Sequence, residues 1–102
     1  MAVAFIQEFK IQGNDQSTTN YDTVAERLNL QDPPEGGILH TAGFDEDAGV
    51  FRIFDVWETR EQGERFNRDQ LGPIVQELLA GRPDATPPDR EGWYELHDVM
   101  RP

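Results

Sequence analysis

The sequence predicts an α+β domain whose elements follow the order β-α-β-β-α-β. Four short runs have the apolar patterning of strands, and two longer segments repeat apolar residues every three or four positions, as helices do. Clusters rich in Gly, Pro and Asp separate these segments. With 102 residues the chain is long enough for one core. We therefore expect a single domain over residues 1–102.

The first half of this pattern is a strand followed by a helix. Both alternating faces of Val3–Lys10 are largely apolar, as in a central strand. Apolar residues then recur at helical spacing within Tyr21–Leu28, after candidate N-caps at Ser17–Thr19. The breaker cluster Asp32–Gly37 cannot continue the helix.

The second half begins with a predicted hairpin. Ile38–Phe44 and Val50–Glu58 have strand patterning, and Asp45–Gly49 is the loop between them.

A second helix follows directly, because Thr59 and Gln62 have the spacing of a capping box. Gly72-Pro73 should kink this helix or split it in two. Gly92–Met100 is the predicted last strand.

This order is that of the ferredoxin-like fold, a four-stranded antiparallel sheet with two helices on one face. The helices can cover only one face, yet the first and third strands are apolar on both. The second face must therefore meet another apolar surface. We expect a homodimer in which the uncovered sheet faces pack together.

Composition excludes several classes of function. The net charge of −11 argues against nucleic acids and anionic membranes as partners. The sequence has no cysteine, which excludes disulfides and thiolate metal sites, and its two histidines lack metal-site spacing. The apolar runs are too short to span a bilayer, and the N-terminus lacks the features of a signal peptide. We expect a cytoplasmic protein.

Asp55 is the first candidate for chemistry, because it interrupts the apolar run of the third strand. It should share a face with Phe51, Ile53 and Trp57, where a carboxylate must be paired or hydrogen-bonded. It is either a general acid/base in a pocket or a structural carboxylate.

His40 and His97 are the only histidines, and both fall in predicted strands. Each is either an acid/base group or a hydrogen-bonded structural residue. If Phe44 pairs with Val50, His40 lies opposite Phe54; a slip of one residue would place it beside Asp55 instead.

The remaining candidates are an arginine and several aromatic residues. Arg52 would stabilise an anion if it faces the pocket. A flat ligand would suit aromatic walls, for which the candidates are Trp57, Phe66, Tyr94 and Tyr21.

Three segments resemble a known group: Ile38–Gly43, the D-V-W-E-T-R-E junction at Asp55–Glu61, and Leu96–Val99. They resemble the dimeric α/β-barrel superfamily of antibiotic-biosynthesis-monooxygenase-like proteins. The resemblance implies a dimeric barrel and a small-molecule site. Members include cofactor-free oxygenases of aromatic polyketides, haem-degrading enzymes, isomerases and cyclases.

The leading hypothesis is therefore a small cofactor-independent enzyme of secondary metabolism that acts on a hydrophobic, aromatic or polyketide-like metabolite. Its acid/base chemistry would assist oxygenation, cyclisation or isomerisation. Two alternatives stay open: a non-catalytic dimeric ligand-binding protein, and a haem-binding protein with His40 or His97 as axial ligand.

Overall fold

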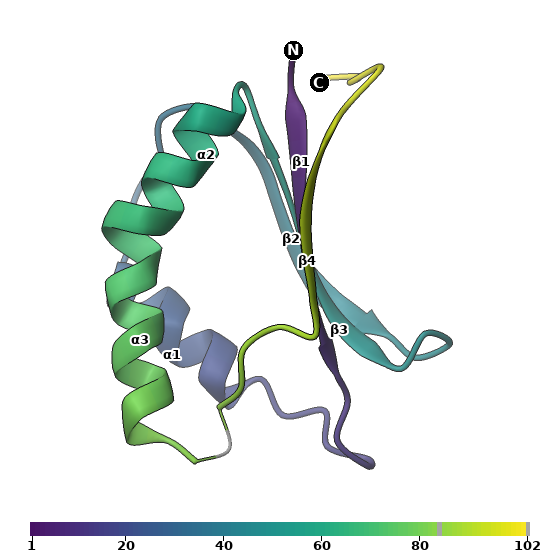
Figure 1. Ribbon diagram of the computed structural model, residues 1–102, viewed down its shortest axis with the longest axis vertical. Coiled ribbons are helices and arrows are strands. Elements are labelled where there is room, and N and C mark those ends of the chain that lie inside the picture. The colour runs from purple at the N-terminus through teal and green to yellow at the C-terminus, as the bar shows by residue number, and fades with distance from the viewer. Residues whose placement is uncertain (84, 102) are drawn as a thin grey trace.

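The computed structural model describes residues 1–83 and 85–101 (Figure 1). Its elements follow the predicted order: β1 (Val3–Lys10), α1 (Thr19–Leu28), β2 (Gly37–Asp45), β3 (Val50–Trp57), α2 (Arg60–Phe66), a π-helical segment (Asn67–Leu71), α3 (Gly72–Gly81) and β4 (Arg90–Glu95). None of the helices in these described ranges combines the length and the apolarity that crossing a bilayer requires.

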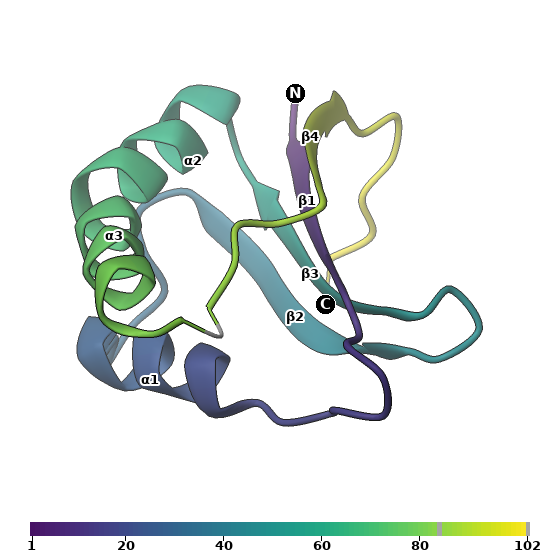
Figure 2. The same cartoon turned by 60° about the horizontal axis from the view of Figure 1, so that its bottom comes forward.

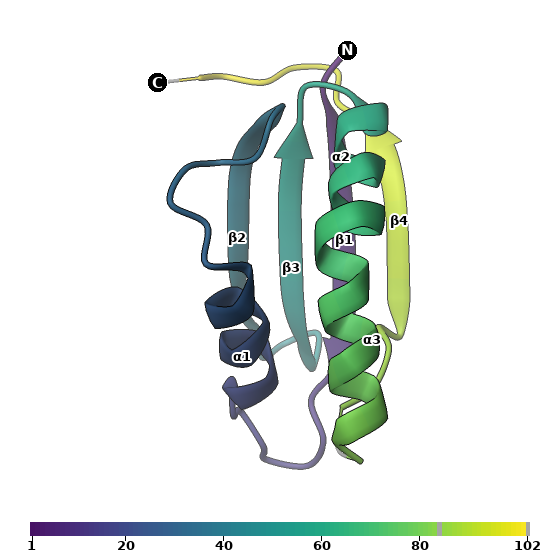
Figure 3. The same cartoon turned by 90° about the vertical axis from the view of Figure 1, so that its left-hand side faces the viewer.

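The four strands form one antiparallel sheet in the order β2-β3-β1-β4. All helices lie on one side of it (Figure 1). Seen from that side, α1 lies in front of β2, and the α2–α3 rod lies in front of β1 and β4 (Figure 3). The prediction of a ferredoxin-like fold, a four-stranded antiparallel sheet with its helices on one face, is confirmed.

The second helix starts and bends as its sequence indicates. The Thr59 side chain accepts the backbone N–H of Gln62 at 3.2 Å, which caps the first turn. Around Gly72-Pro73 the chain does not break. It widens into the π-helical segment, and the backbone N–H of Gly72 reaches back to the carbonyl oxygen of Asn67. This wider turn accommodates a proline without ending the helix.

The loop of the β2–β3 hairpin is shorter than expected. Asp45 pairs with Val50 as part of the sheet, so the loop begins at Glu46. The loop closes because the Asp45 side chain accepts the N–H of Ala48 at 3.1 Å, and Gly49 adopts a left-handed φ of 70°. His40 consequently lies opposite Asp55, so the second of the two predicted registers is the one that forms.

The last strand is both shifted and shorter than the predicted Gly92–Met100. β4 ends at Glu95, because Glu95 already pairs with Val3, the first residue of its partner β1. The segment after β4 then turns along the side of the sheet opposite the helices (Figure 2). There Arg101 forms two hydrogen bonds with Glu58, at 2.6 and 3.0 Å.

The core is concentrated where α2 meets the sheet. Val3, Phe5 and Trp57 are buried there, and Phe66 and Trp93 pack against them. Gly63 allows α2 to approach this closely, because a Cβ at this position would lie 2.6 Å from the Trp93 ring. Farther along the sheet, α1 and α3 leave an apolar cavity between the helices and the strands.

Candidate functional site

The cavity between the helices and the sheet has a volume of about 720 Å³, which is within the usual range for small-molecule sites. Most of its lining side chains are apolar and come from both layers. The sheet contributes Phe9, Phe44, Phe51, Ile53 and Trp57, and the helices contribute Val24, Leu28, Phe66, Leu71, Val75, Leu78 and Leu79.

Asp55, His40 and Tyr21 form one hydrogen-bonded chain at this cavity, which all three of them line. His40 Nδ1 lies 2.5 Å from Asp55 Oδ1, and His40 Nε2 lies 2.5 Å from the Tyr21 hydroxyl oxygen. The Tyr21 and His40 rings are nearly parallel, with an interplanar angle of 3°. In a neutral His40 whose Nδ1–H donates to Asp55, Nε2 is the acceptor for the Tyr21 hydroxyl.

The three residues of this hydrogen-bonded chain come from three different elements. The alternation of β3 places Asp55 on the face that the helices cover, and β2 places His40 directly opposite. This register runs unbroken from Leu39↔Val56 to Asp45↔Val50 at the hairpin loop, and the irregularity between Gly37 and Leu39 lies beyond it. Tyr21 projects from the inner stripe of α1, where its ring meets Phe51 edge-on at 5.6 Å.

The environment shifts the pKa values of His40 and Tyr21. The hydrogen bond that His40 donates to Asp55 raises the pKa of His40, and the carboxylate charge adds to this; partial burial acts in the opposite direction. The pKa of Tyr21 is raised above its ordinary value, mainly by burial and then by the negative charges of Asp55 and Asp22. Tyr21 therefore stays a neutral phenol at neutral pH, and the raised pKa makes His40 a stronger base than a free imidazole.

Trp57 is a further polar feature of the cavity wall. Its side chain is only 3% exposed, and its Nε1–H has no hydrogen-bond partner among the described residues. A buried, unpaired donor costs about 1–3 kcal/mol. Trp57 and Phe66, both predicted as walls, lie together in the cavity lining with their ring centroids 5.4 Å apart.

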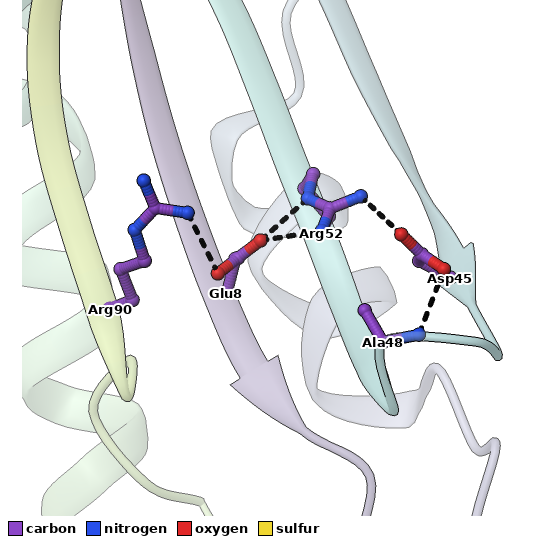
Figure 4. Close-up of polar contacts among 5 residues, drawn as sticks. All are labelled: Glu8, Asp45, Ala48, Arg52 and Arg90. Atoms are coloured by element: carbon purple, nitrogen blue, oxygen red, sulfur yellow. Dashed lines mark hydrogen bonds and ion pairs between the residues drawn. The ribbon is translucent and has the colours of Figure 1, made fainter.

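Arg52 lies on the opposite face of the sheet from Asp55, because successive side chains of β3 alternate. There it pairs with Glu8 at 2.6 Å and Asp45 at 2.7 Å, and Arg90 reaches the other oxygen of Glu8 (Figure 4). The condition that Arg52 face the pocket is therefore not met. These ion pairs account for a glutamate that is only 8% exposed in the middle of a sheet.

Two other candidates also lie outside the cavity. Tyr94 pairs with Ala4 on the face away from the helices and is 48% exposed, so its expected place in the cavity wall is wrong. His97 lies beyond the end of β4 and is exposed, so it does not meet His40. The misplacement of His97 follows from extending the last strand to Met100, whereas the face of Tyr94 is set by the register of β4 against β1.

Gln7 is one of the polar residues of the cavity lining that were not predicted as site residues. Gln7 lies on the helix-covered face of β1, opposite Ile53, and its side chain donates to Glu91 at 3.0 Å. The signal was present in the sequence, since Gln7 is the only polar residue of the face that also carries Val3, Phe5 and Phe9.

A haem does not fit the residues that the structure places here. Both ring nitrogens of His40 are engaged, by Asp55 and by Tyr21, so neither is free as an axial ligand. His97 lies outside the cavity. The arrangement is instead suited to moving protons at the edge of an apolar space.

Comparison with known proteins supports the fold. No family model matches the sequence, and no curated protein matches it. Solved structures do match over nearly the whole chain. A protein from Chloroflexus aurantiacus, proposed to be an antibiotic biosynthesis monooxygenase, is 18% identical with a TM-score of 0.64, covering 98% of this chain and 97% of that one.

Two further structures are similar to the same extent. SnoaB, a cofactor-independent oxygenase from Streptomyces nogalater, is 16% identical with a TM-score of 0.62, covering 97% of this chain and 96% of its own. NE2512 from Nitrosomonas europaea, a protein of unknown function, is 18% identical with a TM-score of 0.69, covering 99% and 94%. The chain thus has the ferredoxin-like fold of antibiotic-biosynthesis-monooxygenase-like proteins. At this level of identity the likeness concerns the fold alone.

Proposed function

We propose that the protein is a small, cofactor-independent enzyme that acts on a hydrophobic aromatic or polyketide-like metabolite bound between the sheet and the helices. One observation carries this proposal: the Asp55–His40 pair lines an otherwise largely apolar cavity. An ionisable pair in such a place can take up or deliver a proton close to a desolvated substrate. The reaction would be an oxygenation, a cyclisation or an isomerisation.

Two features of the cavity support an aromatic ligand. Its volume of about 720 Å³ accommodates a molecule of several fused rings, and Phe51, Trp57 and Phe66 supply aromatic walls. SnoaB, which has the same fold, is a cofactor-independent oxygenase, and this analogy favours oxygenation among the three reactions.

The test is turnover of anthrone, a flat tricyclic ketone with an acidic CH₂ group, followed by product absorbance and by oxygen consumption. We expect Asp55→Asn and His40→Ala to lose at least about 100-fold in kcat, the usual contribution of general acid–base catalysis. His97→Ala is the matched control, because His97 lies outside the cavity. If anthrone or related ketones bind without turnover, the protein is a non-catalytic binding protein. Full activity in both variants would exclude Asp55 and His40 as the acid/base pair.

We also propose that two copies pack through the sheet faces that the helices leave open. That face carries Ile6, Phe54 and Tyr94, next to the ion pairs around Glu8. Tyr94 and the edge-strand residue Leu39 are 48% and 51% exposed, which is high for large apolar side chains.

Light scattering at micromolar concentration tests the dimer. We expect the mass of a dimer for the wild-type chain and of a monomer for Tyr94→Glu, since a charge at this position would be desolvated between the sheets. A wild-type monomer would contradict the proposal.

A further inference from the structure

We propose that the Tyr21 hydroxyl is the group that exchanges a proton with the substrate, that His40 receives this proton through Tyr21, and that the substrate is a phenol or an enol. This inference rests on the proposed function and assigns the roles within the same site. Tyr21 would be the catalytic residue, while His40 and Asp55 would act through it.

The hydrogen-bonding capacity of His40 is already used within the protein. An imidazole has two ring nitrogens, and each forms one hydrogen bond. Nδ1 is 2.5 Å from Asp55 Oδ1, and Nε2 is 2.5 Å from the Tyr21 hydroxyl oxygen. His40 therefore has no nitrogen left for a substrate, although its side chain is 55% exposed. Direct proton transfer from a ligand to His40 would first require that Tyr21 move away.

The Tyr21 hydroxyl, by contrast, can still form further hydrogen bonds. A phenol oxygen donates one hydrogen bond and accepts others. With neutral His40 donating from Nδ1 to Asp55, the Tyr21 proton is directed to Nε2, so the free positions on the Tyr21 oxygen are acceptors. Tyr21 lines the cavity. A ligand must offer a donor to them. An aromatic or enolic O–H meets this requirement, and its flat skeleton can pack against Phe51, which meets the Tyr21 ring edge-on.

The proton inventory of such a step balances without any added reagent. The O–H bond of the substrate breaks and its proton goes to the Tyr21 oxygen. The original Tyr21 proton passes to His40 Nε2. The products are a substrate oxyanion and an imidazolium, and the imidazolium is paired with the Asp55 carboxylate. Asp55 thus holds the imidazole ring in place and stabilises its positive charge.

The surrounding charges favour a neutral ligand. Asp55 and Asp22 both place negative charge near Tyr21. The π-helical segment and α3 pack against α1, and their charged groups there are held in exposed ion pairs. Arg68 pairs with Asp69, and Glu77 pairs with Arg27 of α1. Lys10, Asp15 and Asp32 are exposed residues of the cavity lining. A carboxylate or phosphate would meet repulsion at the chain of three, whereas a phenol or enol enters uncharged.

The experiment compares 2-naphthol with 2-methoxynaphthalene, which has a similar shape but no O–H. Fluorescence titration gives the ratio of their affinities for the wild type, Tyr21→Phe and Tyr94→Phe. Tyr94 is the matched control, because it lies on the opposite face of the sheet. We expect the preference for 2-naphthol to fall about fivefold in Tyr21→Phe, the value of one hydrogen bond, and to stay unchanged in Tyr94→Phe.

A second measurement tests the relay itself. The absorbance of bound 2-naphthol at neutral pH gives the ratio of naphtholate to naphthol in the wild type and in Asp55→Asn. Loss of the carboxylate should lower this ratio about tenfold, because the imidazolium loses its counter-charge. An unchanged ratio would overturn the relay.

The possible binding results separate the two proposals. If both naphthalenes bind the wild type and Tyr21→Phe leaves their affinity ratio unchanged, the role of Tyr21 is wrong, while the aromatic cavity stands. If neither naphthalene binds the wild type, the cavity does not accept aromatic ligands, and the proposed function fails together with this inference.

Discussion

Gly63→Ala tests how closely α2 approaches the sheet. A Cβ on Gly63 would lie 2.6 and 2.9 Å from two ring atoms of Trp93 and 3.0 Å from Trp57. Neither ring can move freely, because Trp93 stacks on Phe5 at 4.3 Å and Trp57 packs on Phe66. The added methyl group therefore has to displace either two indoles or the helix.

The expected change in stability is the difference between two opposing effects. Overpacking a filled core costs about 1–3 kcal/mol, and contacts this short place the cost near the upper end. Alanine is favoured over glycine in a helix by about 1 kcal/mol. We expect a net loss of about 2 kcal/mol in the free energy of unfolding. Gly81→Ala is the matched control, because a Cβ on this helical glycine meets nothing within 4 Å. It should be neutral or slightly stabilising.

Urea unfolding followed by tryptophan fluorescence measures both variants. An unfolding midpoint for Gly63→Ala equal to or above that of the wild type, with an unchanged m-value, would refute the close approach of α2. Trp93→Phe removes the outer ring that meets the new methyl group. In the double variant Gly63→Ala/Trp93→Phe, the two losses should therefore fail to add by about 1 kcal/mol. Full additivity would mean that the two positions do not touch.

Three further predictions concern charges and caps. The pKa of Glu8 is lowered, chiefly by its hydrogen bond with Arg52. The contribution of Glu8 to stability is therefore present above its unfolded pKa and is lost as the pH falls through its folded pKa. The urea midpoint of the wild type should drop on acidification, and that of Glu8→Gln should drop less. Thr59→Ala should cost about 1 kcal/mol by urea unfolding, whereas Thr18→Ala should cost less, because the Thr18 side chain makes no capping hydrogen bond to the backbone. The pKa of His40 is raised, so the contribution of His40 to stability is complete below its unfolded pKa and is lost as the pH rises through its folded pKa. In an NMR titration, Asp55→Asn should lower the His40 pKa. An unchanged pKa would contradict the pairing of His40 with Asp55.

Local chemistry made several elements predictable. The N-cap at Thr59 depends only on residues three positions apart, and its hydrogen bond to the backbone N–H of Gln62 forms as expected. The alternation of side chains along β3 places Asp55 and Trp57 on one face of the sheet and Arg52 on the other, and this also needs no tertiary information. The end of β4 was not predictable in the same way. It depends on where β1 begins, and β1 lies more than 80 residues earlier in the chain.

The candidate site likewise combines features that are set by the local sequence with contacts that are set by tertiary packing. The sequence by itself determined the order of the elements, the two-sided apolarity of the central strands and the presence of a carboxylate among apolar residues, because periodicity and propensity act over a few residues. Only the tertiary structure decided that His40 faces Asp55 and that Tyr21 reaches His40. The first contact depends on which of the two possible registers β2 and β3 adopt, and the second depends on where α1 packs against the sheet. A shift of one residue changes the facing residues of a strand pair, and α1 meets β2 only through tertiary packing, so no local pattern encodes either contact.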